Sequence, residues 1–186
     1  MPKNSTAIAT KTAYPEAHGI TYRTVPAKKD FVQYAASPVT SQYFRECWEK
    51  RVDLMGERAG VFALVGTIFP NMSFHGQQPR TILVAHPRGT QKTEMWRMYF
   101  VDKGAPQEAR DFLRHYYMRY SGPAGLTEQD DMENWSYASS ASAGMMARRY
   151  PYHYKAALGM GGPDRMVPGV VIGEPRGTEQ NPRALY

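Results

Sequence analysis

Cysteine is nearly absent from this sequence, and long apolar runs are absent altogether. Cys47 is the only thiol among 186 residues, which excludes an intrachain disulfide framework, a cysteine-ligated zinc site and an iron–sulfur cluster held by cysteines of this chain. No apolar run approaches the ~18 residues of a membrane-spanning helix, so we expect no membrane span. Residues 1–17 are polar and lack the hydrophobic block of a secretory signal. These absences favour the cytoplasm as the compartment.

The charge balance is basic, but the basic residues are scattered. Lys plus Arg number 23 against 17 Asp plus Glu, a formal net charge of +6. Such a balance suits nucleic acid, an acidic protein partner or no specific partner. The densest basic clusters are the pairs Lys28–Lys29 and Arg148–Arg149, and no known nucleic-acid-binding module is present. We therefore expect no nucleic-acid partner, and a basic nucleic-acid binder stays a minor hypothesis.

The length and the 42% hydrophobic content suit one packed domain, with residues 1–17 as an arm that is flexible or ordered by a partner. Alternating or continuously apolar runs predict strands, whereas apolar residues at three- and four-residue steps predict helices. The predicted strands are residues 20–25, 31–36, 61–69, 80–86 and 92–101. The predicted helices are residues 40–58 with Thr40 as the cap, 106–120 with Pro106 in the first turn, and 127–149. The run of strands from 61 to 101 without helices predicts an antiparallel meander, so the fold class is α+β.

Two further features favour structural roles. Cys47 shares a predicted helix face with Phe44 and Trp48, which favours a small buried hydrophobic residue over a reactive thiol. Beyond Tyr150 the chain is rich in Gly, Pro and Tyr, but its glycines have neither the Lys-Ser/Thr nor the preceding strand of a phosphate loop. That segment is predicted to be a surface wrap or a subunit contact.

The stretch Gly125-Leu-Thr-Glu-Gln-Asp-Asp-Met-Glu-Asn-Trp135 concentrates acidic residues at a predicted helix start. Thr127 and Asp130 have capping-box spacing, and carboxylates in a first turn complement the helix dipole. Neighbouring side chains on a helix point ~100° apart, so Asp130 can serve the cap while Asp131 faces another element. A carboxylate that points into the protein needs a cation, a partner or a proton. From these residues alone, a structural and a functional role both stay open.

Five motifs occur in one order along the chain. They are Phe69-Pro-Asn-Met-Ser-Phe74, His86-Pro-Arg-Gly89, Glu94-Met-Trp96, Val101-Asp-Lys-Gly-Ala-Pro106 and Glu128-Gln-Asp-Asp-Met-Glu-Asn-Trp135. This series resembles the catalytic domain of the large (α) subunit of Rieske-type aromatic-ring-hydroxylating dioxygenases, such as the biphenyl and naphthalene enzymes. The resemblance runs from the region of His18-Gly19 to the C-terminus, so residues 18–186 are expected to be this catalytic domain.

The resemblance implies a helix-grip fold, in which an antiparallel sheet curls over a long C-terminal helix and encloses a substrate cavity. It implies a mononuclear non-haem Fe(II) held by two His and one Asp, a facial triad that leaves positions open for O2. The Asp ligand falls on Asp131, and its neighbour Asp130 is expected in the helix cap with Thr127. The implied activity is O2-dependent cis-dihydroxylation of an aromatic substrate, with electrons from a Rieske [2Fe–2S] cluster.

The resemblance also implies parts that this sequence does not supply. The two iron-binding His of the family lie a few residues apart, shortly before the region that matches His18-Gly19, and the histidines present do not reproduce that pair. One cysteine cannot hold the Rieske cluster. We therefore expect both from the remainder of the α subunit, whether this chain is a split subunit, a truncation or a non-catalytic remnant. A β subunit, a ferredoxin and an α₃ or α₃β₃ assembly are implied as well.

By resemblance, two segments contribute to the substrate wall. The candidates are Phe74, His75, Gln78 and Ile82 in the first, and Ser121, Leu126 and Thr127 in the second, where the family often has bulky aromatic residues. His75 leaves a strand beside Gly and Gln, so a pocket position and a polar turn are both open.

The remaining histidines and aromatic residues favour structural roles. His86 is predicted to be a hydrogen-bonded structural residue, His115 to be exposed, and His18 not to be a ligand. Four aromatic residues, Phe62, Phe69, Trp96 and Phe100, are predicted to pack in the core or to line a cavity.

The leading hypothesis is therefore an iron-dependent oxygenase component that is incomplete alone. The alternative is a non-catalytic helix-grip module that binds a hydrophobic ligand or a partner subunit. The absent His pair favours the alternative, whereas the Glu128–Asp131 segment favours the oxygenase.

Overall fold

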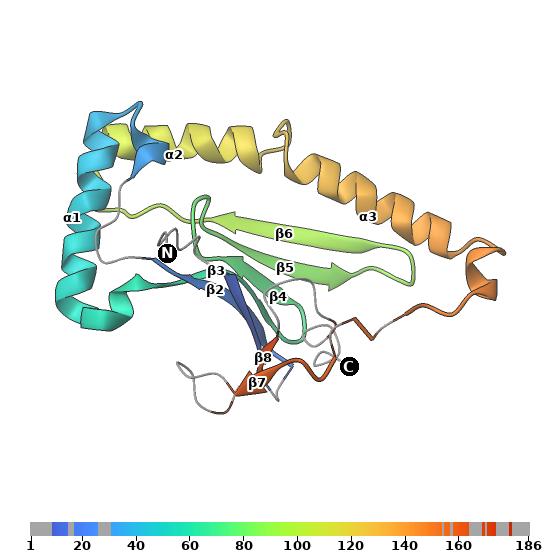
Figure 1. The fold of residues 1–186 in the computed structure, drawn as a ribbon. Coiled ribbons are helices and arrows are strands. Elements are labelled where there is room, and N and C mark those ends of the chain that lie inside the picture. The colour runs from blue at the N-terminus through green and yellow to red at the C-terminus, as the bar shows by residue number, and fades with distance from the viewer. Residues whose placement is uncertain are drawn as a thin grey trace.

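The computed structural model describes residues 9–14, 17–25, 31–153, 155, 156, 158–163, 169, 171–173 and 179. Within these residues one eight-stranded antiparallel sheet has the strand order β6-β5-β4-β3-β2-β1-β8-β7 (Figure 1). The strands are β1 Ala9–Ala13, β2 Gly19–Thr24, β3 Val61–Ile68, β4 Met72–His75, β5 Thr81–Pro87, β6 Thr93–Tyr99, β7 Gly162–Pro163 and β8 Val171–Gly173. Strands β3 to β6 each pair with the next along the chain, which confirms the predicted meander, although its short second strand, β4, was not among the predicted strands.

Three α-helices complete the described fold: α1 Pro38–Met55, α2 Gln107–Tyr120 and α3 Glu128–Ser142. Short 3-10 turns are η1 Val32–Tyr34, η2 Gly56–Gly60 and η3 Ala147–Arg149. Figure 1 shows α2 and α3 one after the other along the β6 side of the sheet, with α1 across the end where α2 begins. Tyr99 of β6 stacks on Tyr117 of α2 with 4.4 Å between ring centroids, so these helices pack on the sheet. This is the predicted α+β arrangement.

The start of α1 differs from the prediction in its cap. Ser37, not Thr40, caps the helix, since the Ser37 Oγ accepts a hydrogen bond from the Thr40 N–H at 3.2 Å. Pro38 occupies the first turn, where its missing N–H costs nothing. The helix ends at Met55 because Gly56 adopts a φ of 54°, a conformation that suits glycine. Helix α1 is therefore shorter at its C-terminal end than the predicted 40–58.

Helix α2 begins one residue later than predicted, with Pro106 at the N-cap instead of in the first turn, and helix α3 is shorter than predicted. Pro106 directly precedes α2, and Ala109 and Leu113 on its apolar stripe are 0% and 2% exposed. Helix α3 ends at Ser142, and the predicted continuation to residue 149 is wrong, since only the short turn η3 follows. Gly144, with its low helix propensity, lies between the two.

The predicted strand over residues 31–36 is wrong, because this segment contains η1. Phe31 and Tyr34 are both buried, and both stack on Phe44 of α1. A three-residue step places two side chains on one side of a helical turn, whereas a strand would place them on opposite faces. The same core cluster includes Trp48 and Leu113, with Phe62 of β3 packed against it.

The chain ends also differ from expectation. Residues 9–13 of the predicted arm form β1, which pairs with β2 and with β8. The segment beyond residue 150, predicted to be a surface wrap, contributes β7 and β8 to the edge of the same sheet. The sequence Ala-Thr-Lys-Thr-Ala of β1 has no apolar alternation, so the periodicity could not reveal this backbone pairing. The rest of the predicted arm, residues 1–8, 15 and 16, lies outside the described residues.

Candidate metal and substrate site

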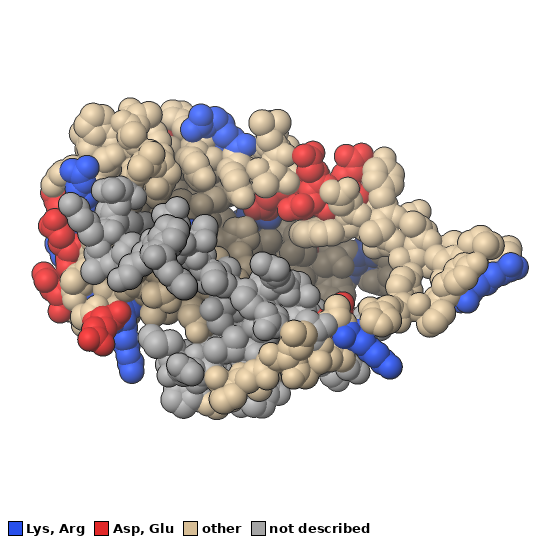
Figure 2. All heavy atoms as spheres, in the orientation of Figure 1, with Lys and Arg blue, Asp and Glu red and all other residues tan. Residues whose placement is uncertain are grey.

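A hollow of about 630 Å³ lies between the sheet and the start of α3. We name it the α3 hollow. Its walls include Phe74, His75, Leu83, Met95, Arg97, Asp131 and Trp135, which come from β4, β5, β6 and α3. Its volume lies within the ~300–1,000 Å³ of small-molecule sites. Figure 2 shows acidic side chains gathered along the first half of α3, above a hollowed part of the surface.

An ion pair fixes the first turn of α3 against the sheet. Arg97 of β6 pairs with Glu128, and the two side chains are 17% and 10% exposed. The Ser121 Oγ donates a second hydrogen bond to Glu128 Oε1 at 2.7 Å. Burial lowers the pKa of the Arg97 guanidinium. The predicted strand 92–101 contains Arg97, but no sequence pattern indicated that Glu128 is its partner.

This anchor explains where Asp131 lies. Residues three and seven positions after Glu128 share its helix face, so Asp131 and Trp135 lie toward the sheet and line the α3 hollow. The Asp131 side chain is also exposed, so no burial forces a counter-charge on it. Asp131 has no hydrogen bond or ion pair with any described residue. Its role as a metal ligand stays a prediction.

The predicted cap of α3 is wrong. Thr127 stands at the N-cap position, but its φ of −96° and ψ of −50° are already helical and its side chain makes no capping hydrogen bond. Asp130 is exposed and makes no hydrogen bond within the described residues. The acid that stabilises this helix start is instead Glu128, through Arg97 and Ser121.

The histidines differ in their surroundings. His75 lines the α3 hollow, and burial, followed by the charge of Arg97, lowers the pKa of its imidazole. The Nδ1 of His18 accepts a hydrogen bond from the Phe69 N–H at 3.0 Å. His86 packs its ring on Trp96 at 5.1 Å but makes no hydrogen bond to a described residue. His115 is exposed, as predicted.

The predicted substrate residues are not all brought together. Phe74, His75 and Thr127 line the α3 hollow, whereas Gln78 lines a second hollow beside α1. Ser121 is buried on Glu128, Leu126 is 82% exposed, and Ile82 is half-buried between Phe74 and Met98 of the neighbouring strands. Substrate contact by these residues stays a prediction.

The four aromatic candidates also differ in their exposure. Phe62 stacks on Trp48 with 5.5 Å between ring centroids and lines the second hollow, whereas Phe69, Trp96 and Phe100 are 49%, 55% and 48% exposed. For these three, the expectation of core packing is wrong. The predicted burial of Cys47 is only partial, since Cys47 is half-buried and also lines the second hollow.

Tyr99, the last residue of β6, has a phenol with a shifted pKa. Burial raises the pKa of Tyr99 to about 12. Its hydroxyl is buried and has no hydrogen-bond partner in the part of the chain that the structure describes.

Two general properties bear on metal and membrane binding. Among the described residues, no group of three or more His, Cys, Asp or Glu is placed to hold a metal ion. No helix within the same residues combines the length and apolarity needed to cross a bilayer.

The antiparallel sheet, the helices α2 and α3 and the ligand-sized hollow between the sheet and α3 define a fold of the helix-grip type. The family model "Ring hydroxylating alpha subunit (catalytic domain)" matches residues 5–159, and this chain belongs to that family. The fold agrees, since naphthalene 1,2-dioxygenase solved with indole in its active site superposes with a TM-score of 0.76 at 23% identity. That superposition covers 100% of this chain and 41% of the other.

Sequence relatives carry the same family description. The biphenyl 2,3-dioxygenase subunit alpha of Rhodococcus jostii (strain RHA1) is 38% identical over 93 residues, 50% of this chain and 20% of that protein. The biphenyl dioxygenase subunit alpha of Metapseudomonas furukawaii is 32% identical over 129 residues, 66% of this chain and 28% of that protein. The benzene 1,2-dioxygenase subunit alpha of Pseudomonas putida is 34% identical over 93 residues, 50% of this chain and 20% of that protein. The chain thus spans less than a third of the length of these relatives.

Proposed function

We propose that this chain is the C-terminal catalytic portion of an aromatic-ring-hydroxylating dioxygenase large subunit. Membership of the ring-hydroxylating α-subunit family supports this role. The proposed reaction adds both atoms of O2 to an aromatic double bond and gives a cis-dihydrodiol. Its two electrons would arrive through a Rieske [2Fe–2S] cluster on the remainder of the α subunit. The observation that carries the proposal is the position of Asp131 on the wall of the α3 hollow.

The described residues do not by themselves fit a mononuclear iron. A facial triad needs two imidazoles beside the carboxylate, and no such group is assembled within the described part of the chain. We propose that Asp131 supplies the single carboxylate ligand and that two histidines come from the remainder of the α subunit. An exposed carboxylate with no partner among the described residues suits that role, because it is free to meet a group from another polypeptide.

Residues of this chain would prepare the site in three ways. The Arg97–Glu128 pair holds the first turn of α3 on β6 and so sets the position of Asp131. Phe74, Leu83 and Met95 give the α3 hollow apolar surface that suits an aromatic ring. His75, with its lowered pKa, stays neutral at pH 7 and adds no charge to that surface.

Partners and compartment follow from the same family membership. We propose assembly with the Rieske-containing remainder of the α subunit, in an α₃ or α₃β₃ complex with a β subunit and a ferredoxin as electron donor. An aromatic small molecule is the proposed substrate, and the cytoplasm the proposed compartment.

Co-expression with a Rieske-containing polypeptide of the same family tests the proposal. We expect about one mononuclear iron per copy of this chain in the complex, as one facial triad requires, together with O2-dependent turnover of an aromatic substrate. Asp131→Ala should remove this iron and the turnover while the far-ultraviolet circular dichroism is unchanged. The matched control is Asp130→Ala, an exposed neighbour, which should retain both. Equal iron content in the two variants would refute the role of Asp131.

A non-catalytic helix-grip module is the second candidate. The absence of a three-ligand group within the described residues favours it. It predicts that a hydrophobic ligand or a partner subunit binds, but that no mononuclear iron is gained even when the Rieske-containing polypeptide is present.

A further inference from the structure

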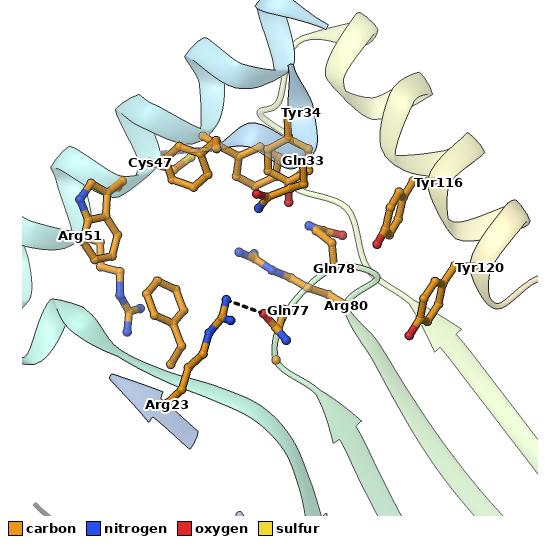
Figure 3. Close-up of a pocket in the computed structure, with 15 residues that line it drawn as sticks. Arg23, Gln33, Tyr34, Cys47, Arg51, Gln77, Gln78, Arg80, Tyr116 and Tyr120 are labelled. Carbon is orange, nitrogen blue, oxygen red and sulfur yellow. Dashed lines mark hydrogen bonds between the residues drawn. The ribbon is translucent and has the colours of Figure 1, made fainter. Parts of the chain in front are cut away.

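A second hollow, of about 390 Å³, lies between α1, α2 and the turn that joins β4 to β5 (Figure 3). We name it the arginine hollow. Arg23 from β2, Arg51 from α1 and Arg80 at the start of β5 all line it, and none of its described lining residues is acidic. It shares only Tyr120 with the α3 hollow. A concave site with three guanidinium groups and no carboxylate has a positive potential that attracts anions.

The three arginines differ in what they already bind. Arg51 donates hydrogen bonds to the carbonyl oxygens of Ala59 and Val61 at 2.9 and 2.8 Å and lies over the Phe62 ring, so its role is structural. Arg23 donates to the Gln77 Oε1 at 3.2 Å, but its Nε is buried and has no partner. Arg80 has no side-chain hydrogen bond or close ion pair with a described residue, but its charge interacts at longer range with Asp102 and helps to lower the pKa of that carboxyl.

The polar ends of four side chains point into one part of the arginine hollow. Figure 3 shows Arg23, Arg80, Gln77 and Gln78 pointing into the same part of the arginine hollow. The Gln78 Oε1 is buried and accepts no hydrogen bond within the described residues. Buried polar atoms are normally paired, so the unpaired N–H of Arg23 Nε indicates a missing hydrogen-bond acceptor in this space. The guanidinium groups specify an anion, because they offer several N–H donors and no acceptor.

The aromatic side chains that line the arginine hollow indicate which class of anion it suits. Aromatic side chains surround the guanidinium groups, among them Phe44, Phe62, Tyr116 and Tyr120. Such walls suit the face or edge of an aromatic ring. A planar carboxylate matches the guanidinium fork with two parallel hydrogen bonds. Inorganic phosphate suits the hollow less well, since it has no apolar part to contact these aromatic walls.

We propose that the arginine hollow binds an ionised aromatic carboxylic acid, with its carboxylate between Arg23 and Arg80 and its ring against the aromatic wall. Binding there needs neither iron nor Asp131, so this site and the proposed dioxygenase function can fail separately. The site is also distinct from the α3 hollow, in which the proposed substrate lies.

Calorimetric titration of the full 186-residue chain with benzoate, at pH 7 and low ionic strength, tests the site. We expect saturable binding at one site, weakened by added salt because ion pairs are screened. Benzamide keeps the ring without the charge, and acetate keeps the charge without the ring. Each should bind at least tenfold more weakly than benzoate. Equal affinity for benzoate and benzamide, or no saturation by benzoate at millimolar concentration, would overturn the proposal. Inorganic phosphate that binds as tightly as benzoate would do the same, because it would show a general anion surface.

Matched arginine variants locate the binding. Arg80→Gln should weaken benzoate binding at least tenfold, and the fold should be kept because Arg80 is exposed and its interaction with the exposed Asp102 is only long-range. Arg23→Gln should have a similar effect, and circular dichroism checks that it folds. The control is Arg114→Gln, an exposed arginine on α2 that does not line the arginine hollow. An affinity of Arg80→Gln equal to that of Arg114→Gln would refute the assignment.

Discussion

Removing one member of the Arg97–Glu128 pair should destabilise the protein far more than removing both. The pair joins β6 to the first turn of α3, and its side chains are only 17% and 10% exposed. Arg97→Met strips the counter-charge from Glu128, and Glu128→Met strips it from Arg97. Methionine is chosen because its unbranched side chain fills much of the same space.

The magnitude follows from burial. Breaking a buried ion pair costs ~3–5 kcal/mol, because the remaining charge keeps its desolvation penalty and loses its partner. The residual exposure of both side chains moderates this, so we expect ~3 kcal/mol for each single variant. In the double variant no charge is left buried. Its main cost is the Ser121 hydroxyl, which donates to Glu128 at 2.7 Å and would lose its acceptor. One such hydrogen bond contributes ~1 kcal/mol.

Urea unfolding followed by circular dichroism measures these differences. The free energy of unfolding is extrapolated to water for the wild type, the two single variants and the double variant. Additive effects would lower the stability of the double variant by ~6 kcal/mol, whereas we expect a loss of ~1 kcal/mol. The matched control is Arg88→Met, which breaks the Arg88–Glu94 pair between side chains that are 59% and 44% exposed. Exposed pairs contribute little, so this variant should unfold close to the wild-type midpoint.

Two results would refute the reasoning. Arg97→Met could unfold at the same urea concentration as Arg88→Met, which would mean that burial does not govern the pair. Alternatively, the double variant could be as unstable as the sum of the single variants, which would mean that the two charges do not interact.

Two further predictions concern buried polar groups. Burial lowers the pKa of His75 below its ordinary 6.5, so the folded state binds a proton less readily than the unfolded state. The contribution of His75 to stability should therefore be complete above pH 6.5 and decline as the pH falls below it. His75→Gln should flatten this part of the stability profile measured by urea unfolding, whereas the exposed His115→Gln should not. An unchanged slope in His75→Gln would contradict the assignment of this pH dependence to His75. Tyr99→Phe should leave the stability unchanged or raise it by up to ~1 kcal/mol, because the lost hydroxyl has no partner among the described residues and the ring stack on Tyr117 is kept. Tyr43→Phe, which loses a hydrogen bond of 2.6 Å to Asp102, should lower the urea midpoint, and an equal loss in both variants would show that the Tyr99 hydroxyl is paired.

Some elements were predictable because their patterns are local. The alternation in residues 92–101 and the apolar run at 61–69 predicted β6 and β3, and Pro106 predicted the start of α2. The cap of α1 was misassigned by three residues, since Ser37 and Thr40 are both capping residue types and only the hydrogen bond distinguishes them. The local pattern of residues 31–36 predicted a strand. It could not show that Phe31 and Tyr34 pack together on α1, which requires a helical turn.

In the candidate site, too, only the features with a local sequence pattern were predictable. The acidic stretch at residues 128–131 correctly predicted a helix start. It could not indicate that its first acid, Glu128, forms an ion pair, because the partner Arg97 belongs to a strand that is distant in the sequence. The arginine hollow had no sequence pattern at all, since Arg23, Arg51 and Arg80 come from three separate elements.

The sequence by itself determined the family, the strands β2, β3, β5 and β6 and the three helices, because motifs and hydrophobic periodicity depend on residues that are close along the chain. Only the tertiary structure decided which charges meet, which hollows form and that β1 and β8 pair at the edge of the sheet. Those contacts join segments far apart in the chain, and a contact between distant segments imposes no spacing that a local pattern could reveal.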